Sequence, residues 1–330
     1  MKALVYTKPH EMQLQTWADP MLAEGESLLR IEAVGICGSD MHAYHGHDPR
    51  RVPPMILGHE FVGTIVSGVN QGARVTGNPL IACGVCDYCV QGRPNLCSNR
   101  TMVGMSRAGA YAELMSIPAK TLIELPSGMD AVQAALTEPA ATAVHALHLA
   151  ERSLMRPLNE ATALVIGGGA IGLLMALLMK SKGLVAPWLA EVNALRRVSA
   201  EKHAGVRGFN PIESDGPAEA SCEVVIDAVG SKATRGAAFR AVKPGGVIVH
   251  IGLQDWASEI DMRKLTLSEI TLIGTYTYST ADLRATVKAI HAGAFGDLSW
   301  VEERPLSEGA RAFTDLDQGK TASAKIVLRP

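Results

Sequence analysis

The stretch ATALVIGGGAIGLLMALLMKSKG, residues 161–183, decides the fold of this chain. It begins as a short apolar strand and passes through a turn in which Gly167, Gly169 and Gly172 follow the pattern G-x-G-x-x-G. An apolar helix follows and stops at Gly183. The first glycine permits the tight turn, the second lets backbone approach a pyrophosphate, and the third lets the helix pack closely on the strand. The stretch therefore predicts a strand–turn–helix unit that binds a dinucleotide at the helix N-terminus.

The segments after this stretch continue the alternation of strand and helix. The strand-like runs are VAPWLAE, CEVVIDAVG, VIVHIGL and TLIGTYTY, and the helix-like runs are ALRRVSAEKHAG and SKATRGAAFRAV. This alternation predicts a parallel sheet with helices on both faces. The fold class that we expect is therefore α/β, with a doubly wound parallel sheet.

An acidic residue is expected at the end of the second strand of such a unit, about 20 residues beyond the glycines. Glu191 stands there, and its carboxylate suits the ribose hydroxyls of NAD and repels the 2′-phosphate of NADP. Arg196 and Arg197 leave NADP open as the alternative, because an arginine can pair with that phosphate. The predicted cofactor contacts are Gly167, Gly169, Ala170, Ile171, Gly172, Glu191 and Arg196.

The first third of the chain has a different pattern. Short runs rich in β-branched residues are bounded by Gly and Pro: KALVYT, SLLRIEAVGI, HEFVGTIVSGV, GARVTG and YAELMSIP. They predict a partly open barrel or sandwich with functional loops. The pattern becomes helical in AATAVHALHLAERSL, and the end of the chain is predicted to form a helix, ADLRATVKAIHAG, and then a strand, SAKIVLRP.

Four of the six cysteines lie together in NPLIACGVCDYCVQGRPNLCSNR, with the spacing C-x2-C-x2-C-x7-C. Four thiolates fill the tetrahedral shell of zinc and leave no open position, so this site is predicted to be structural. An iron–sulfur cluster also takes four cysteines, but no partner redox motif accompanies it. A nucleic-acid-binding finger would carry more basic residues than Arg93 and Arg100, and four unrelated thiols are the remaining alternative. The predicted ligands are Cys83, Cys86, Cys89 and Cys97.

A second set of metal-binding residue types is scattered along the chain. Cys37 lies in the glycine-rich loop GICGSDMHAYHG, His59 and Glu60 lie in LGHEFVG, and Glu138 lies in TEPA. Cysteine, histidine and carboxylate side chains are suitable zinc ligands, and three protein ligands leave a fourth position free for substrate. These residues therefore predict a catalytic zinc that acts on an alcohol as a Lewis acid.

Polar residues next to Cys37 suit a proton path. The hydroxyl of Ser39 can pass on the proton of an alcohol, and the imidazole of His42 can release it to solvent. A surface role for His42 is an equal alternative on spacing alone. Asp40 is expected to hold the loop or to orient a ligand histidine.

The composition excludes several classes of protein. The chain has 330 residues, a net charge of −2 and a pI near 6.6, so no global field attracts nucleic acid or an anionic membrane surface. The N-terminus has no apolar segment of the kind that a secretory signal needs. The apolar residues 163–179 are interrupted by glycines and suit a buried strand and helix better than a membrane span. We therefore expect a cytoplasmic protein in which clustered cysteines bind metal.

Together the segments GICGSDMH, GHEFVG, TEPAATAVHAL and VIGGGAIGLL and the four-cysteine lobe carry a resemblance. They occur in the same order in the zinc-dependent medium-chain dehydrogenases/reductases of the alcohol dehydrogenase superfamily, and the chain resembles the polyol or sorbitol dehydrogenase-like branch. The resemblance implies a GroES-like catalytic domain over residues 1–146, with the zinc lobe at 78–100. It implies a Rossmann domain over 147–282 and a return to the catalytic domain over 283–330.

The same resemblance implies roles for residues. Cys37 and His59 would bind the catalytic zinc, and Glu60 would be a ligand that exchanges with water or substrate. Typical alcohol dehydrogenases have a cysteine ligand at the position of Glu138, whereas a glutamate there is typical of the polyol branch. Glu138 would touch zinc directly or through water. Ser39 and His42 fall on the proton-relay positions. The resemblance also implies two zinc ions per chain, and a homodimer or homotetramer that assembles through the region of TLIGTYTYS.

The expected function is hydride transfer from a secondary alcohol to NAD by a zinc-dependent oxidoreductase. The substrate class is a polyol, a sugar alcohol or a sugar acid. One alternative is a simple alcohol or aldehyde dehydrogenase-reductase that uses NADP(H). Another, from a different class, is a non-catalytic nucleotide-binding protein that reuses the fold.

Overall fold

Six parallel strands form the sheet that the glycine-rich stretch begins, in the order β13-β12-β11-β14-β15-β16. The computed structural model describes residues 1–213 and 216–330. The winding reverses between β11 and β14, and ligands of open α/β sheets bind at such a switch point. The strands are β11 (Ala163–Ile166), β12 (Trp188–Ala190), β13 (Arg207–Phe209), β14 (Cys222–Asp227), β15 (Val242–His250) and β16 (Thr271–Gly274).

Helices cover both faces of this sheet because its central strands are apolar on both sides. On β11, Ala163 and Val165 pack into the core that α4 and α5 share, whereas Leu164 and Ile166 pack with α7 on the opposite face. Successive side chains of a strand point to opposite faces, so a continuous apolar run serves two cores. The helices are α4 (Thr137–Ser153), α5 (Ala170–Ser181), α6 (Ala194–Ala204), α7 (Lys232–Ala241), α8 (Met262–Leu267) and α9 (Thr280–His291).

The other half of the molecule is built on a mostly antiparallel sheet with the order β10-β6-β5-β3-β18-β17, in which β9 also pairs with β3. Two small sheets, β2-β1-β4 and β7-β8, complete it. Its strands are β1 (Lys2–Lys8), β2 (Glu11–Thr16), β3 (Glu26–Gly35), β4 (Met55–Ile56), β5 (Glu60–Ser67), β6 (Arg74–Gly77), β7 (Leu80–Ile81), β8 (Thr101–Met102), β9 (Leu114–Pro118), β10 (Leu122–Glu124), β17 (Val301–Pro305) and β18 (Lys325–Arg329). Its helices are α1 (Gly38–Tyr44), α2 (Asp87–Val90), α3 (Ala131–Ala135) and α10 (Gly309–Asp317).

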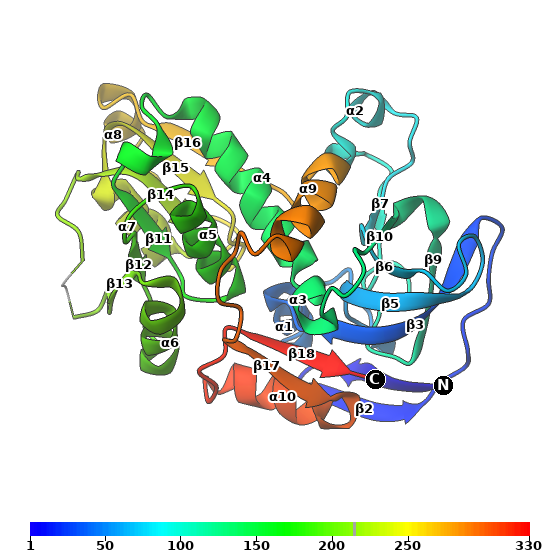
Figure 1. Ribbon diagram of the computed structural model, residues 1–330. Coiled ribbons are helices and arrows are strands. Elements are labelled where there is room, and N and C mark those ends of the chain that lie inside the picture. The colour runs from blue at the N-terminus through cyan, green and yellow to red at the C-terminus, as the bar shows by residue number, and fades with distance from the viewer. Residues whose placement is uncertain (214–215) are drawn as a thin grey trace.

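The end of the chain returns to the N-terminal half, as Figure 1 shows. Strand β18 pairs antiparallel with β3, with Val327 opposite Gly35. The sequence predicted this last strand, but the preceding β17 and α10 were not predicted. The expected domain boundaries after residues 146 and 282 both fall inside helices, α4 and α9, which pack on each other between the two halves. Among the described residues, no helix has both the length and the apolar character that crossing a membrane requires.

Candidate metal centre and dinucleotide groove

Three of the predicted zinc ligands meet where two paired strands, β3 and β5, bring their ends together. Cys37 follows β3 and caps α1, where its Sγ accepts the Ser39 backbone N–H at 3.5 Å. His59 directly precedes β5, and Glu60 begins it. One ligand atom each from Cys37, His59 and Glu60 lies within 4.8 Å of the other two. Sulfur, imidazole nitrogen and carboxylate oxygen are a donor set that suits zinc, and a fourth position stays free.

A glycine on the neighbouring strand makes room for Glu60. Gly35 lies opposite Glu60 in the β3–β5 pair. A Cβ at Gly35 would lie only 2.0 Å from Glu60 Oε2. A side chain on that residue would therefore displace the carboxylate. This steric clash explains why the first residue of GICGSDMH is a glycine.

A carboxylate oxygen of Asp40 faces the imidazole of His59. Its Oδ1 lies 3.5 Å from His59 Nδ1, and its Oδ2 accepts the Tyr111 hydroxyl at 2.7 Å and the Cys37 N–H at 3.1 Å. Burial opposes a charged His59 imidazole, but the charges of Asp40 and Cys37 outweigh it and raise the pKa of His59 well above its ordinary value. With Nδ1 facing a carboxylate, Nε2 is the nitrogen that remains for a metal.

A buried lysine faces Glu60. Lys325 Nζ lies 2.7 Å from both Glu60 carboxylate oxygens and donates to the Ile36 carbonyl at 2.7 Å. Burial disfavours the ammonium, but the charges of Glu60 and Cys37 raise the pKa of Lys325 above its usual value. Lys325 was not predicted from the sequence. Its only signal was a lysine directly before the apolar residues 326–328 of the strand KIVLR.

Glu138 lies near this group but outside it. It is in the first turn of α4, and its Oε1 accepts the Tyr278 hydroxyl at 2.8 Å. Burial, followed by repulsion from Glu60, raises the pKa of Glu138 to about 6, although His59 acts in the opposite direction. Tyr278 was not predicted from the sequence. The structure thus brings Cys37, His59 and Glu60 into one group and places Glu138 beside it with one oxygen already engaged.

The two predicted relay residues have different surroundings. The Oγ of Ser39 accepts an Arg51 N–H at 3.3 Å, and the Ser39 carbonyl accepts another at 3.2 Å. His42 lies on α1, and burial followed by the positive potential of His45 and His47 lowers the pKa of His42. His42 lines the cavity described next, whereas Ser39 is not among the described residues that line it.

One cavity of about 690 Å³ is lined both by Cys37 and Glu60, two of the predicted metal ligands, and by the glycine-rich turn. The turn is shaped by its glycines, since a Cβ at Gly172 would lie 1.8 Å from the Gly167 carbonyl oxygen. Space is open around Gly169, where a Cβ would have nothing within 4 Å. The predicted cofactor residues that line this cavity are Gly167, Gly169, Ala170, Ile171, Gly172, Glu191 and Arg196.

A second cavity of about 660 Å³ adjoins the first at Gly167 and Glu191. Its walls include the apolar side chains of Leu164, Ile166 and Phe209. Two adjoining cavities that share the glycine-rich turn suit the two halves of a dinucleotide.

Glu191 stands at the junction of these cavities. It accepts backbone N–H bonds from Gly168 at 2.8 Å and from Asn193 at 2.7 Å, one on each carboxylate oxygen. Arg196 lines the first cavity, and its buried Nε has no hydrogen-bond partner within the described parts of the chain. The structure therefore places both a fixed carboxylate and a guanidinium at the groove.

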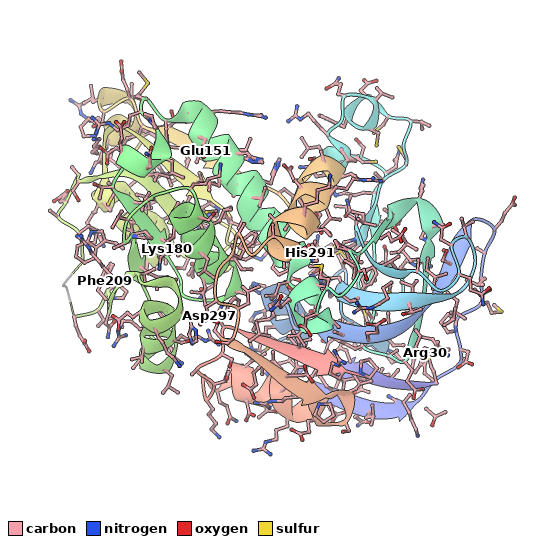
Figure 2. The ribbon with its side chains drawn as sticks, viewed as in Figure 1. Arg30, Glu151, Lys180, Phe209, His291 and Asp297 are labelled. Carbon is pink, nitrogen blue, oxygen red and sulfur yellow. The ribbon has the colours of Figure 1, made fainter. Side chains whose placement is uncertain are left out.

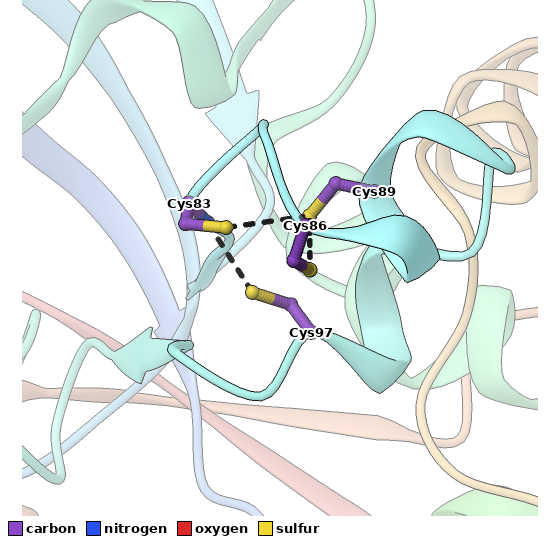
Figure 3. Close-up of side chains that lie close together, drawn as sticks. All are labelled: Cys83, Cys86, Cys89 and Cys97. Carbon is purple, nitrogen blue, oxygen red and sulfur yellow. Dashed lines mark hydrogen bonds between the residues drawn. The ribbon is translucent and has the colours of Figure 1, made fainter.

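The four clustered cysteines also converge, as Figure 3 shows. Their ligand atoms all lie within 4.8 Å of one another, with Cys86 Sγ 3.5 Å from Cys89 Sγ. Backbone N–H groups of Val85 and Cys86 lower the pKa of Cys83 to about 6, which favours a thiolate. Burial and the neighbouring thiols raise the pKa of Cys89 to about 12. These opposite shifts favour a thiolate at Cys83 and a thiol at Cys89. A cation bound by the four sulfurs would favour the thiolate at each cysteine, because the thiolate is the form that binds a metal.

Comparisons with known proteins agree with this architecture. Residues 23–127 match the alcohol dehydrogenase GroES-like domain, and residues 170–292 match the zinc-binding dehydrogenase model. The chain is 32% identical over 308 residues to 2-dehydro-3-deoxy-L-galactonate 5-dehydrogenase of Pseudoalteromonas atlantica, with 89% of this chain and 88% of the relative covered. It is 28% identical over 327 residues to L-galactonate-5-dehydrogenase of Escherichia coli, with 95% and 94% covered.

A solved structure gives the same result for the fold. A zinc-binding dehydrogenase from Sinorhizobium meliloti, bound to NADP, superposes with a TM-score of 0.88 at 29% identity and covers 100% of this chain and 99% of its own. The mostly antiparallel half is thus the GroES-like domain and the parallel sheet is Rossmann-like, as the sequence predicted. The chain belongs to the zinc-type medium-chain dehydrogenases of the alcohol dehydrogenase superfamily, and it is an oxidoreductase that acts on alcohols with NAD(P).

Proposed function

We propose that the protein oxidises a secondary alcohol of a sugar acid or polyol to the ketone, with NAD as the hydride acceptor. One observation carries the proposal: a single cavity is lined by Cys37 and Glu60 and by the glycine-rich turn. The relatives named for galactonate-type substrates support a sugar acid within this class.

The catalytic zinc would be held by Cys37, His59 and Glu60, whose donor atoms are close enough together for one ion. Glu138 would act through a water molecule, since its Oε1 already accepts the Tyr278 hydroxyl. When bound, zinc supplies a Lewis acid for the substrate hydroxyl and NAD supplies the acceptor for hydride. The reaction removes a hydride with its electron pair from the carbinol carbon and a proton from the hydroxyl.

That proton would be carried by His42, which lines the cavity, and by Ser39, which is not among the described residues that line it. Because Ser39 Oγ accepts a hydrogen bond from Arg51, its own proton remains available to donate elsewhere. The lowered pKa keeps His42 neutral near pH 7, so its free ring nitrogen can accept a proton and release it to solvent. Ser39 and His42 therefore form the proposed path out of the site.

Lys325 balances the charge of the site. With zinc bound, the half-buried Cys37 as thiolate and the buried Glu60 as carboxylate would carry two negative charges, and the buried Lys325 supplies one positive charge. The ammonium also holds the Glu60 carboxylate in place through both oxygens. The Glu60 carboxylate could therefore bind Lys325 alone or Lys325 together with the zinc ion, and it would have a positively charged partner in either state.

The position of Glu191 supports NAD over NADP. Both of its oxygens are fixed by backbone N–H groups at the junction of the two cavities, where an anionic 2′-phosphate would meet a carboxylate. The unpaired Nε of Arg196 supports the opposite choice, and the relative from S. meliloti binds NADP. The preference between NAD and NADP is therefore measured in the substrate panel described below.

A second, structural zinc would be held by the four clustered cysteines, Cys83, Cys86, Cys89 and Cys97.

Assembly of two copies of the chain would use strand β16. That strand is at the edge of the parallel sheet and pairs, among the described strands, with β15 alone. Exposed apolar side chains lie on and beside it: Leu272 belongs to the strand, and Trp256 lines a cavity together with Leu272. A second copy that pairs with this edge would cover them and give the proposed homodimer, or one half of a homotetramer.

A substrate panel tests the function. Sugar acids, polyols and simple secondary alcohols are assayed with NAD and with NADP, before and after chelation. We expect reduction of NAD with a sugar acid or polyol, loss of activity on chelation, and recovery with Zn²⁺. Cys37→Ser should abolish turnover with the fold retained, whereas Cys222→Ala, a buried thiol in β14, should stay active. Chelator-resistant activity, or near-normal turnover of Cys37→Ser, would contradict the proposal, and NADP-only activity would reverse the cofactor choice.

A further inference from the structure

Three side chains with metal-binding groups meet beside the cavity that Cys37 and Glu60 line, apart from the two zinc sites proposed above. They are His10, His45 and Asp317, and one ligand atom from each lies within 4.8 Å of the others. They come from three separate elements. His10 is in the turn between β1 and β2, His45 follows α1, and Asp317 ends α10. Such a convergence is not produced by any local sequence pattern.

Their geometry is close to that of a metal site. His45 Nε2 lies 2.6 Å from Asp317 Oδ1, and the His10 and His45 ring centroids are 5.3 Å apart. A tetrahedral zinc with ligands at about 2.0–2.1 Å separates ligand atoms by about 3.3 Å. The His45–Asp317 pair would need to open by only a small amount. Both side chains are about one-third exposed, so neither is locked by packing.

We propose that His10, His45 and Asp317 form a third, exchangeable site for a divalent cation of the zinc or cobalt type. Two imidazoles and one carboxylate are ligands for such ions, and three protein ligands leave room for water. In the free site the hydrogen bond between His45 and Asp317 already holds these two side chains together, and a cation would take the place of the proton that they share.

The position of the site gives the cation something to act on. His45 and Asp317 line the same cavity as Cys37 and Glu60. Two residues beyond Asp317, the Gly319 carbonyl accepts a hydrogen bond of 2.9 Å from Asn193, the cap of α6 in the dinucleotide-binding half. A bound cation would therefore tether α1, α10 and the β1–β2 turn where the two halves meet.

Metal uptake by the full-length holoenzyme tests the proposal, with Co²⁺ and Zn²⁺ each used alone as probe. His10→Asn is the first variant, because His10 has a φ of +62° and asparagine tolerates that conformation. His45→Gln is the second and lies on another element. His291→Asn removes an exposed imidazole from α9 and is the matched control (Figure 2).

Equilibrium dialysis with elemental analysis should show one more bound cation in wild type and in His291→Asn than in His10→Asn or His45→Gln. The affinity of the extra site should fall by roughly 100-fold or more in both variants, because each lacks a direct ligand. The comparison is between variants, so it holds whatever the other two sites contain and whatever the substrate is. Equal uptake by wild type and His10→Asn, with circular dichroism unchanged, would overturn the proposal.

Discussion

The ammonium nitrogen of Lys325 lies 2.7 Å from each carboxylate oxygen of Glu60, and both side chains are buried. The residues are 265 positions apart, so this pair joins the last strand of the chain to the first residue of β5. A buried ion pair contributes little net stability, but removal of one partner leaves a buried charge unpaired. A cation bound to Glu60 would compensate the loss of Lys325.

Lys325→Met should therefore destabilise the metal-free chain more than the zinc-loaded one. We expect the free energy of unfolding to fall by about 3–5 kcal/mol without metal, and by less with zinc, because the ion pairs with the orphaned carboxylate. Urea denaturation with and without chelator measures both values. Lys320→Met changes an exposed lysine in the same tail and is the control. Equal losses in both metal states would show that Glu60 does not contact the ion.

The sequence predicted the parts of the site that depend on local spacing. The four cysteines lie within one loop region, and the glycine-rich turn lies between one strand and one helix, so neither needs the rest of the fold to be found. Cys37, His59, Glu60 and Glu138 were predicted as a set because their residue types match zinc chemistry and their segments resemble a family. The structure groups only the first three, and their closeness depends on the pairing of β3 with β5.

Lys325 and Tyr278 could not be predicted in the same way. Each is brought to the site by the path of the chain: β18 returns to pair with β3, and the segment after β16 crosses to α4. No short window contains both Tyr278 and Glu138, which are 140 positions apart. A buried lysine in an apolar strand is a signal that something compensates it, but the partner is defined only by the tertiary fold.

The cysteine lobe supports the segment that carries Tyr278. Asn95 Nδ2 donates to the Tyr276 carbonyl at 3.0 Å, and the Arg100 guanidinium lies 5.0 Å from the centre of the Tyr276 ring. Cys97→Ser should lower the metal content by about one ion per chain and lower the melting temperature. Activity should fall only as far as the folded fraction falls, with Cys222→Ala as the thiol control. Unchanged metal content in Cys97→Ser would contradict the structural site.

The raised pKa of Glu138 predicts a pH dependence of stability in the metal-free chain. Its pKa is about 6 in the folded chain against an ordinary 4.5, so between these values the folded chain holds a proton that the unfolded chain has released. Stability from this group should therefore fall as pH rises from about 4.5 to about 6, by about 2 kcal/mol, and stay constant above.

Glu138→Gln should remove this pH dependence, because an amide does not titrate but can still accept the Tyr278 hydroxyl. The measurement is the difference in unfolding free energy between wild type and Glu138→Gln across a pH series in chelator. If this difference in unfolding free energy decreases as the pH rises, the result supports burial and the charge of Glu60 as the causes of the raised pKa of Glu138. A flat difference would mean that the carboxyl titrates normally.

Two glycines of the turn offer a matched pair of variants. A Cβ at Gly172 would lie 1.8 Å from the Gly167 carbonyl oxygen and 3.2 Å from Val165 Cγ1, so the backbone must move. A Cβ at Gly169 would have nothing within 4 Å, and its φ of −71° is ordinary for any residue. Gly172→Ala should therefore destabilise the chain itself by about 1–3 kcal/mol or more.

Gly169→Ala should instead leave the free protein nearly as stable as wild type, with a loss of at most about 1 kcal/mol at a helix cap. Its methyl group would stand where we propose that the pyrophosphate approaches, so the Kd for NADH should rise about 10-fold, equivalent to about 1.4 kcal/mol. Thermal melts without cofactor and NADH fluorescence titrations separate the two effects. Within the described residues, no protein atom lies within 4 Å of a Cβ at Gly169, so the added methyl group could obstruct only a ligand. Normal NADH binding by Gly169→Ala would therefore mean that the pyrophosphate does not contact the backbone there.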